Sequence, residues 1–164
     1  ILNSIKQLSV TGQSRSHVHL LESINEALTL LKNLIGKVTI QLKINDTPKI
    51  MANNGELVQV WLNIIKNACE SMLTENVSEH KLIIATYHID NYVQIKISDN
   101  GPGIPSEIRE HIFQPNYTTK KEGLSFGLGL GLSIVQGIVN SYNGEIEIQS
   151  KQGETTFSIK LPVT

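Results

Sequence analysis

The sequence predicts a two-layer α/β sandwich, in which a mixed, mostly antiparallel five-stranded sheet is covered on one face by about three helices. Two observations support this prediction. Four stretches alternate apolar and polar residues with the period of a strand, so one face of the sheet is expected to be wet and the other covered. Three other stretches carry apolar residues at helical spacing and supply the cover.

The alternating stretches place strands at 38–44, 93–97, 146–148 and 157–161. A fifth stretch, "KLIIATYH" at 81–88, is apolar enough to be a central strand. The last two alternating stretches follow each other closely, as in a hairpin. Along the chain we therefore expect a helix, a strand, a helix, a strand pair, a loop, a helix and a second strand pair.

Helices are expected at 20–35, 55–73 and 131–142. Gly36 is expected to end the first of them at the C′ position, where glycine is favoured. Residues 113–128 show no sustained period and contain proline, glycine, threonine and lysine. A loop of this length inside a compact domain is usually functional or disordered.

Composition excludes several classes of function. The chain has 164 residues, enough for one domain, and 40% of them are hydrophobic. Its 14 basic residues nearly balance its 15 acidic ones, which argues against a nucleic-acid surface or a polybasic membrane patch. The single Cys69 excludes an internal disulfide, and no apolar run reaches the length of about 18 residues that a membrane span needs.

The first residues are expected to lie outside the sandwich. Residues 1–10 carry apolar side chains at helical spacing, and the polar stretch "TGQSRS" follows them. The chain begins without methionine, so we expect it to be part of a longer protein.

The stretch "YVQIKISDNGPGIP" ends a strand with a carboxylate. Val93, Ile95 and Ile97 are predicted to face the covered side of the sheet, and Asp99 is in phase with them. A buried, ionised carboxylate is unfavourable unless a donor meets it, and the glycines that follow allow backbone to approach a ligand closely. The alternative is that Asp99 only caps the turn, as aspartate before glycine often does.

Two asparagines lie one turn apart in the helix "ELVQVWLNIIKNACESM". Asn63 and Asn67 share a face of this helix, opposite the apolar stripe that contains Trp61. Two amide oxygens at this spacing can complete the coordination shell of a Mg²⁺ that keeps its waters and phosphate oxygens. The alternative is an ordinary solvated helix face.

Glycines alternate with leucines in "SFGLGLGLSIV", at the start of the third helix. Gly127, Gly129 and Gly131 let consecutive backbone N–H groups converge, and the helix adds its unpaired N-terminal amides. Such an arrangement binds phosphate oxygens. A loop precedes the glycines and the lysine–serine/threonine signature is absent, so neither the dinucleotide-binding fingerprint nor the P-loop fits.

In their order and spacing these motifs resemble those of a known family. The asparagine helix, "DNGPGIP", "IFQPNYTTK" and "GLGLGLSIV" resemble the N box, first glycine box, F box and second glycine box of sensor histidine kinase catalytic domains. These domains belong to the GHKL ATPase group. The resemblance extends from about residue 20 to the C-terminus, and the forms "PNYTTK" and "NACESM" are most similar to the nitrogen-regulatory branch.

The resemblance implies the Bergerat-type ATP-binding fold, with ATP and Mg²⁺ as cofactors. It implies that residues 17–164 form the catalytic, ATP-binding domain and that residues 1–16 hold the end of a dimerisation helix and a linker. Residues 114–128 would form the lid over the nucleotide.

The resemblance also implies roles for single residues. Asp99 would accept a hydrogen bond from the adenine amino group and disfavour guanine, Asn67 would coordinate Mg²⁺ beside Asn63, and Phe113 would anchor the lid. The other implied nucleotide contacts are Gly101, Gly103, Ile104, Thr118, Thr119, Lys120, Gly127, Leu128, Gly129, Leu130, Gly131 and Leu132. The implied catalytic set is Asn63, Asn67 and Lys66, and either Lys66 or Lys120 would meet the phosphates.

The implied reaction is phosphoryl transfer from ATP to a histidine. GHKL hydrolases place a glutamate one turn before the metal asparagine to activate water, and here that position is Asn63, which cannot act as a base. Transfer to a supplied nucleophile needs mainly positioning and charge stabilisation. The alternatives are a GHKL-type ATP hydrolase and a non-catalytic interaction module that keeps the fold.

No acceptor histidine is evident, because none of the five histidines is followed by the acidic residue that marks the acceptor in this family. We expect the acceptor on a dimerisation domain upstream, in a homodimeric parent protein, with a response-regulator receiver domain as the next partner. The chain is expected to be cytoplasmic and to contact neither nucleic acid nor membrane. Anchoring of the parent protein in the inner membrane is left open.

Overall fold

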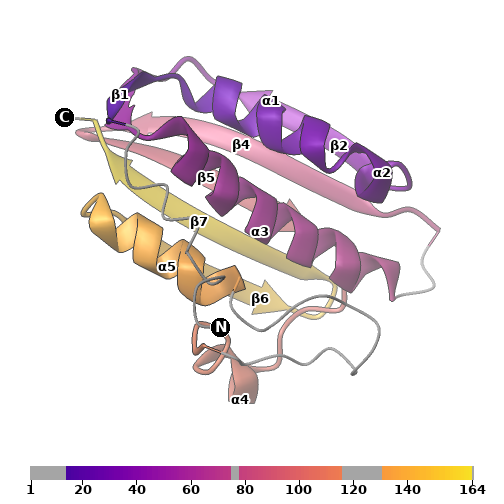
Figure 1. Cartoon of the computed structure of the whole chain (residues 1–164). Helices are drawn as coiled ribbons and strands as arrows, with labels where there is room; N and C mark the ends of the chain where they lie inside the picture. Colours follow the sequence, from indigo (N-terminus) through magenta and orange to yellow (C-terminus); the bar gives the residue numbers. More distant parts are fainter. Residues whose placement is uncertain (1–13, 75–77, 116–130, 164) are drawn as a thin grey trace, which may run out of the picture.

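The computed structural model describes residues 14–74, 78–115 and 131–163. In Figure 1 the three longer helices α1, α3 and α5 lie over one face of a five-stranded sheet. The opposite face of the sheet carries no helix among the residues described. The predicted two-layer α/β sandwich is therefore confirmed.

The sheet has the strand order β2-β4-β5-β7-β6. The edge strand β2 runs parallel to β4, and the other neighbouring strands are antiparallel, so the predicted mixed, mostly antiparallel sheet is also confirmed. The bounds are Thr39–Ile44 for β2, Lys81–Ile89 for β4, Tyr92–Asp99 for β5, Glu145–Lys151 for β6 and Glu154–Pro162 for β7.

The covered face of the sheet follows the predicted alternation. Val93, Ile95 and Ile97 of β5 are buried, and β7 places Leu161 and Phe157 opposite the first and last of them. Leu42 is in the predicted apolar phase of β2 but is 42% exposed, because β2 is an edge strand paired only with β4. Burial of the apolar side chains thus decreases toward this edge of the sheet, while it is nearly complete in β5 and β7.

The three covering helices are α1 Leu20–Leu30, α3 Asn54–Leu73 and α5 Gly131–Ser141. The helix expected at 20–35 is divided, because Leu31 has φ −93° and ψ 8° and a separate short helix, α2 Lys32–Ile35, follows it. The helical run ends at Gly36, as expected, and this residue has a right-handed conformation with φ −59° and ψ −19°. The right-handed conformation lets Val38 donate back to the Ile35 carbonyl at 2.9 Å and close the turn into β2.

Helix α3 links the other helices of the covering layer. Trp61, at its centre, is fully buried, and its indole N–H donates to the Ser23 hydroxyl of α1 at 2.8 Å. At the start of α3 the Asn53 side chain accepts from the amides of Gly55 and Glu56, as an N-cap does. The Asn53 amide donates to the Tyr142 hydroxyl, which follows α5, at 2.9 Å. Full burial of each large apolar side chain in this layer stabilises the fold by roughly 1.5–3 kcal/mol.

Three short elements were not predicted from the sequence. β1 Ser16–Val18 and β3 Ile50–Ala52 form a two-stranded antiparallel sheet, and α4 Ser106–Arg109 is a single turn. Elements this short cannot display a period of 2 or 3.6 residues. Arg15, just ahead of β1, donates to the Ser141 carbonyl at 3.1 Å and lies 4.4 Å from the centre of the Tyr142 ring. Residues 15 and 16, which the sequence assigns to the linker, thus contact the domain.

None of the helices described has the length and apolar character needed to cross a membrane.

Candidate functional site

The site is built around Asp99, the last residue of β5. Its side chain lies on the covered face of the sheet and is only 6% exposed. Oδ1 accepts a hydrogen bond from the Gly101 amide at 2.9 Å. Burial raises the pKa of Asp99 from 3.8 to about 6, although the Gly101 hydrogen bond opposes the shift. This carboxylate is therefore a buried acceptor with capacity left, since a carboxylate has about four acceptor positions.

The C-terminal half of α3 forms one wall beside Asp99. A Cβ atom built on Gly101 would lie 2.9 Å from Asp99 Oδ1 and 3.3 Å from the Ser71 hydroxyl of α3. Cys69, on the same helix, is fully buried, and its pKa is raised to about 11 by burial and by the charges of Asp99 and Glu70. The thiol is therefore neutral at physiological pH and contributes to the wall as a small apolar group.

The loop after Asp99 packs closely on the β6–β7 hairpin. Gly103 has φ +85°, and a Cβ atom there would lie 2.3 Å from the Lys151 carbonyl oxygen at the end of β6. The next residue, Ile104, donates its amide to the Ser150 hydroxyl at 2.7 Å. Glycine is thus required at 103 by backbone contact within the protein and by the left-handed conformation.

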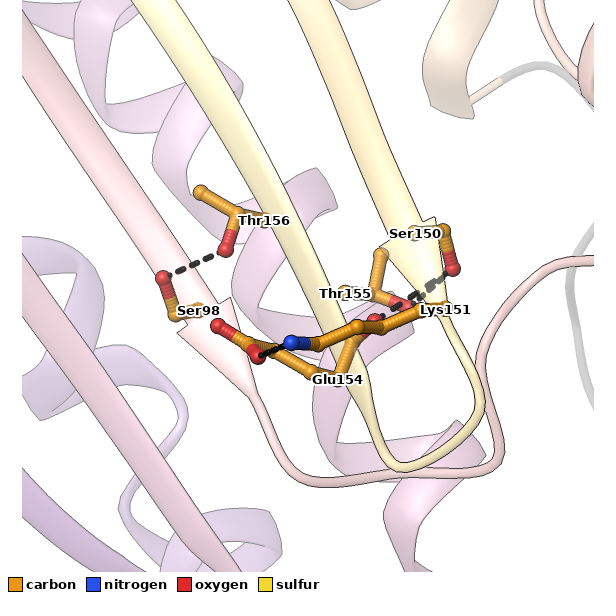
Figure 2. Close-up of polar contacts among 6 residues, drawn as sticks. All are labelled: Ser98, Ser150, Lys151, Glu154, Thr155 and Thr156. Atoms are coloured by element: carbon orange, nitrogen blue, oxygen red, sulfur yellow. Dashed lines mark hydrogen bonds and ion pairs between the residues drawn. The ribbon is translucent and has the colours of Figure 1, made fainter.

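Thr155 is a site residue that sequence reasoning missed. It is 4% exposed and lies directly opposite Asp99 in the β5–β7 register. Its hydroxyl is 2.8 Å from the Ser150 hydroxyl, and Figure 2 shows this pair near the turn of the hairpin, beside the Lys151–Glu154 ion pair. The signal was present in the sequence, because Thr155 is the one polar residue in phase with Phe157, Ile159 and Leu161. A polar side chain among buried apolar ones is expected to have a hydrogen-bond partner or a functional role.

The asparagine face of α3 meets the start of α5. Asn63 and Asn67 are both half-buried, and a Cβ atom built on Gly131 would lie 3.6 Å from Asn63 Oδ1. Within the part of the chain that is described, the buried Nδ2 of Asn63 has no hydrogen-bond partner. The structure therefore places Asn63 of the predicted pair beside Gly131, the last of the predicted glycines, and its Nδ2 has no partner among the described residues.

Lys66, the third residue of the implied catalytic set, lies between the two asparagines in sequence. Its Nζ is 3.9 Å from Glu70 Oε1, one turn further along α3, and its side chain is 39% exposed. An exposed pair at this distance is weak, so the lysine can leave it for another anion. Three more residues of the implied site, Ile104, Phe113 and Leu132, are partly buried and pack against the core.

Seven of the implied nucleotide contacts lie outside the described residues. They are Thr118, Thr119, Lys120, Gly127, Leu128, Gly129 and Leu130.

The donor set suits a hard cation that keeps other ligands. The described residues hold no group of three or more His, Cys, Asp or Glu that could form an all-protein metal site. The amide oxygens of Asn63 and Asn67 are the kind of ligand that Mg²⁺ accepts alongside water and phosphate oxygens. The residues present thus fit Mg²⁺ delivered together with a nucleotide.

Comparison with known proteins gives a consistent result. Residues 52–164 match the family described as "Histidine kinase-, DNA gyrase B-, and HSP90-like ATPase". The chain is 35% identical over 124 residues to the sensory histidine kinase/phosphatase NtrB of Vibrio alginolyticus, covering 71% of this chain and 34% of that protein. It is 37% identical over 145 residues to the sensor histidine kinase ZraS of Escherichia coli, covering 85% of this chain and 29% of that protein. The chain spans about a third of the length of these two relatives.

Solved structures show the same fold. The nucleotide-free catalytic domain of histidine kinase ThkA superposes with a TM-score of 0.79 at 26% identity, covering 93% of this chain and 97% of that domain. ThkA in complex with the response regulator protein TrrA superposes with a TM-score of 0.75 at 27% identity, covering 92% of this chain and 42% of that chain.

Proposed function

The chain belongs to the histidine kinase-, DNA gyrase B- and HSP90-like ATPase family, and on this premise we propose that it binds ATP with Mg²⁺ and donates the γ-phosphate to a protein histidine. The family implies ATP binding. The relatives named above are sensory histidine kinases, which are ATP:protein-histidine phosphotransferases.

The buried Asp99 carboxylate is the observation that carries the proposal. Among the described residues, the Gly101 amide is the one donor to a side chain that is only 6% exposed. A buried carboxylate with spare acceptor capacity is satisfied by a ligand that brings an N–H group. The exocyclic amino group of adenine supplies such a donor, whereas guanine presents an oxygen at the corresponding position and would be repelled. Adenine specificity thus follows from the charge of Asp99.

The phosphate end of the nucleotide is assigned to Asn63, Asn67 and the start of α5. The unpartnered Asn63 Nδ2 can donate to a phosphate oxygen, and the Gly131 end of α5 contributes backbone amides and the positive end of the helix dipole. Asn67 is the residue assigned to Mg²⁺. When bound, Mg²⁺ would neutralise charge that develops on the phosphates during transfer.

Transfer is proposed rather than hydrolysis because of the side chain at position 63. An asparagine amide cannot take a proton from water, so this position orients and donates but does not activate a nucleophile. The nucleophile must then be supplied by the acceptor, and the chain contributes positioning and electrostatic stabilisation. We assign the acceptor to a histidine on the dimerisation domain of a homodimeric parent protein. The next acceptor would be an aspartate of a response-regulator receiver domain, which agrees with the complex recorded for ThkA.

Titration calorimetry with ATP and with GTP, each in the presence and absence of Mg²⁺, tests the proposal. We expect ATP binding that Mg²⁺ strengthens and no measurable GTP binding. Incubation of the chain with γ-labelled ATP is expected to give no stable label on the chain and no steady release of phosphate. Absence of ATP binding would point to a non-catalytic module, and steady phosphate release would point to a hydrolase.

A further inference from the structure

Arg109 holds two carbonyl groups from segments that are far apart in sequence. It is the last residue of α4, and its Nε donates to the Ile104 carbonyl at 3.1 Å. Its Nη2 donates to the Ser150 carbonyl, near the end of β6, at 2.9 Å. A planar guanidinium can serve both acceptors at once through its fixed fork of donors, which a lysine ammonium cannot reproduce.

A second set of contacts joins the same two segments. The Ile104 amide donates to the Ser150 hydroxyl, and the same hydroxyl lies 2.8 Å from that of Thr155 (Figure 2). Gly103 meanwhile packs against the Lys151 carbonyl with no room for a side chain. The far end of the loop 100–104 is thus fixed to the β6–β7 hairpin by a guanidinium, a hydroxyl and a backbone contact.

The near end of the same loop begins at Asp99. The Gly101 amide bonds to the Asp99 carboxylate, and Asp99 lies opposite Thr155 in the sheet. Polar contacts therefore run from Arg109 through Ile104 and Ser150 to Thr155, the cross-strand partner of the carboxylate. The near end of the loop thus lies beside β7 and its far end contacts β6, the two strands of one hairpin.

We propose that Arg109 is a positioning residue for the adenine end of the site. By tying the loop 100–104 to the β6–β7 hairpin, it sets the geometry in which Asp99 and the Gly101 backbone meet the base. The inference rests on the adenine-binding role proposed for Asp99. Both hydrogen bonds that the guanidinium makes to described residues go to backbone carbonyls, so Arg109 is assigned to act through the loop and not by touching phosphate.

The variant Arg109→Lys tests this inference, with dissociation constants measured for ATP by calorimetry and for adenosine by NMR titration. Because the effect is on the base, both constants are expected to rise by the same factor, about 5- to 10-fold, which is the size of one typical intramolecular hydrogen bond. A merely structural role would lower the unfolding midpoint and leave both constants unchanged. A direct phosphate contact would weaken ATP and leave adenosine unaffected. Either of these results overturns the proposal.

Arg15→Lys is the matched control. Arg15 is the only other arginine and also donates to a backbone carbonyl, but it lies next to β1, which Figure 1 draws far from α4. We expect it to leave both dissociation constants unchanged within about twofold, a difference of roughly 0.4 kcal/mol. A wild-type chain that binds neither ligand would contradict the proposed function itself, which separates that failure from a failure of the present inference.

Ser150→Ala provides a second test that does not depend on the folding of Arg109→Lys. It removes the acceptor of the Ile104 amide, so both dissociation constants are again expected to rise together. In the double variant the two effects are expected to be less than additive, because both substitutions release the same residue, Ile104. Full additivity, or unchanged affinity in Ser150→Ala, would contradict the proposal.

Discussion

Gly101 donates its amide hydrogen to Asp99 Oδ1 at 2.9 Å, closing a turn directly after the end of β5. The bond favours the ionised carboxylate, yet burial outweighs it and raises the pKa of Asp99 to about 6. At neutral pH the free protein therefore holds a buried negative charge with incomplete hydrogen bonding. The protonated form of Asp99 favours folding of the free protein, whereas the ionised form favours binding of a donor ligand.

The stability of the free protein is expected to depend on pH through Asp99. Because its folded pKa of about 6 exceeds the unfolded value of 3.8, the folded state binds more protons between these values. The contribution of Asp99 to the free energy of unfolding is then fully present below about pH 4 and declines as the pH rises to about 6, by on the order of 3 kcal/mol. Urea unfolding at a series of pH values measures the slope. The control is Asp99→Asn, whose profile must lack this decline; parallel profiles would contradict the prediction.

The same substitution is expected to separate stability from binding. Asp99→Asn removes the buried charge, so at pH 8 the variant is expected to be more stable than the wild type. Its affinity for ATP is expected to fall at least about tenfold, because an amide can turn its own donor toward the adenine amino group. Calorimetry and urea unfolding on one preparation check both effects. Undiminished affinity in this variant would remove Asp99 from the proposed site.

ATP affinity of the wild type is expected to decrease as the pH falls through about 6. Protonation of Asp99 removes the acceptor charge, so the change has the opposite sign to the change in stability of the free protein. Calorimetric titrations at pH 5.5 and pH 7.5 measure it. Adenosine, which has no phosphate that titrates in this range, is the control, and an equal loss for ATP and adenosine would locate the effect at the base.

Gly103 and Gly153 form a matched pair for testing the close packing of the loop. Their φ angles are +85° and +84°, but a Cβ atom on Gly103 would lie 2.3 Å from the Lys151 carbonyl, whereas nothing lies within 4 Å of one on Gly153. Gly153→Ala is expected to destabilise the fold by about 1–2 kcal/mol through strain alone. Gly103→Ala adds a backbone clash, and we expect a loss about 2 kcal/mol larger, with weakened ATP binding. Equal losses of unfolding free energy in the two variants would show that the loop 100–104 can move away from Lys151 at little cost, and would contradict the prediction.

Asn67 is expected to carry the Mg²⁺-dependent part of ATP affinity. Asn67→Ala should reduce the gain in affinity that Mg²⁺ provides, and should leave affinity in EDTA nearly unchanged. Gln59→Ala is the control, because Gln59 is an exposed amide two turns earlier on the same helix. A Mg²⁺ effect of full size in Asn67→Ala would assign the metal to other ligands.

Long periodic segments were predictable because burial repeats along them. The alternation of Val93, Ile95 and Ile97 gave the phase of β5, and with it the burial of Asp99. The apolar stripe around Trp61 gave α3 within a residue or two, and its opposite face gave the two asparagines. These features depend on local sequence alone, and the structure agrees with them.

What escaped prediction depends on contacts between distant segments. β1 and β3 are three residues each and exist only because they pair with each other. The division of the helix at Leu31 was not predicted, because the apolar spacing continues across this residue. Arg109 was not predicted, because its acceptor on β6, the Ser150 carbonyl, reaches it only when the hairpin packs on the loop. The placement of a polar side chain against another segment is a tertiary property, so no local pattern carried it.

The small sheet formed by β1 and β3 connects the residues before α1 to the start of α3. β3 ends at Ala52, immediately before Asn53, the cap of α3, and β1 is bonded to β3 over three residue pairs. This pairing therefore couples Ser16 directly to Ala52, the residue before the cap of α3. Since α3 also carries Asn63 and Asn67, a change in the position of β1 would act on the helix that holds both asparagines.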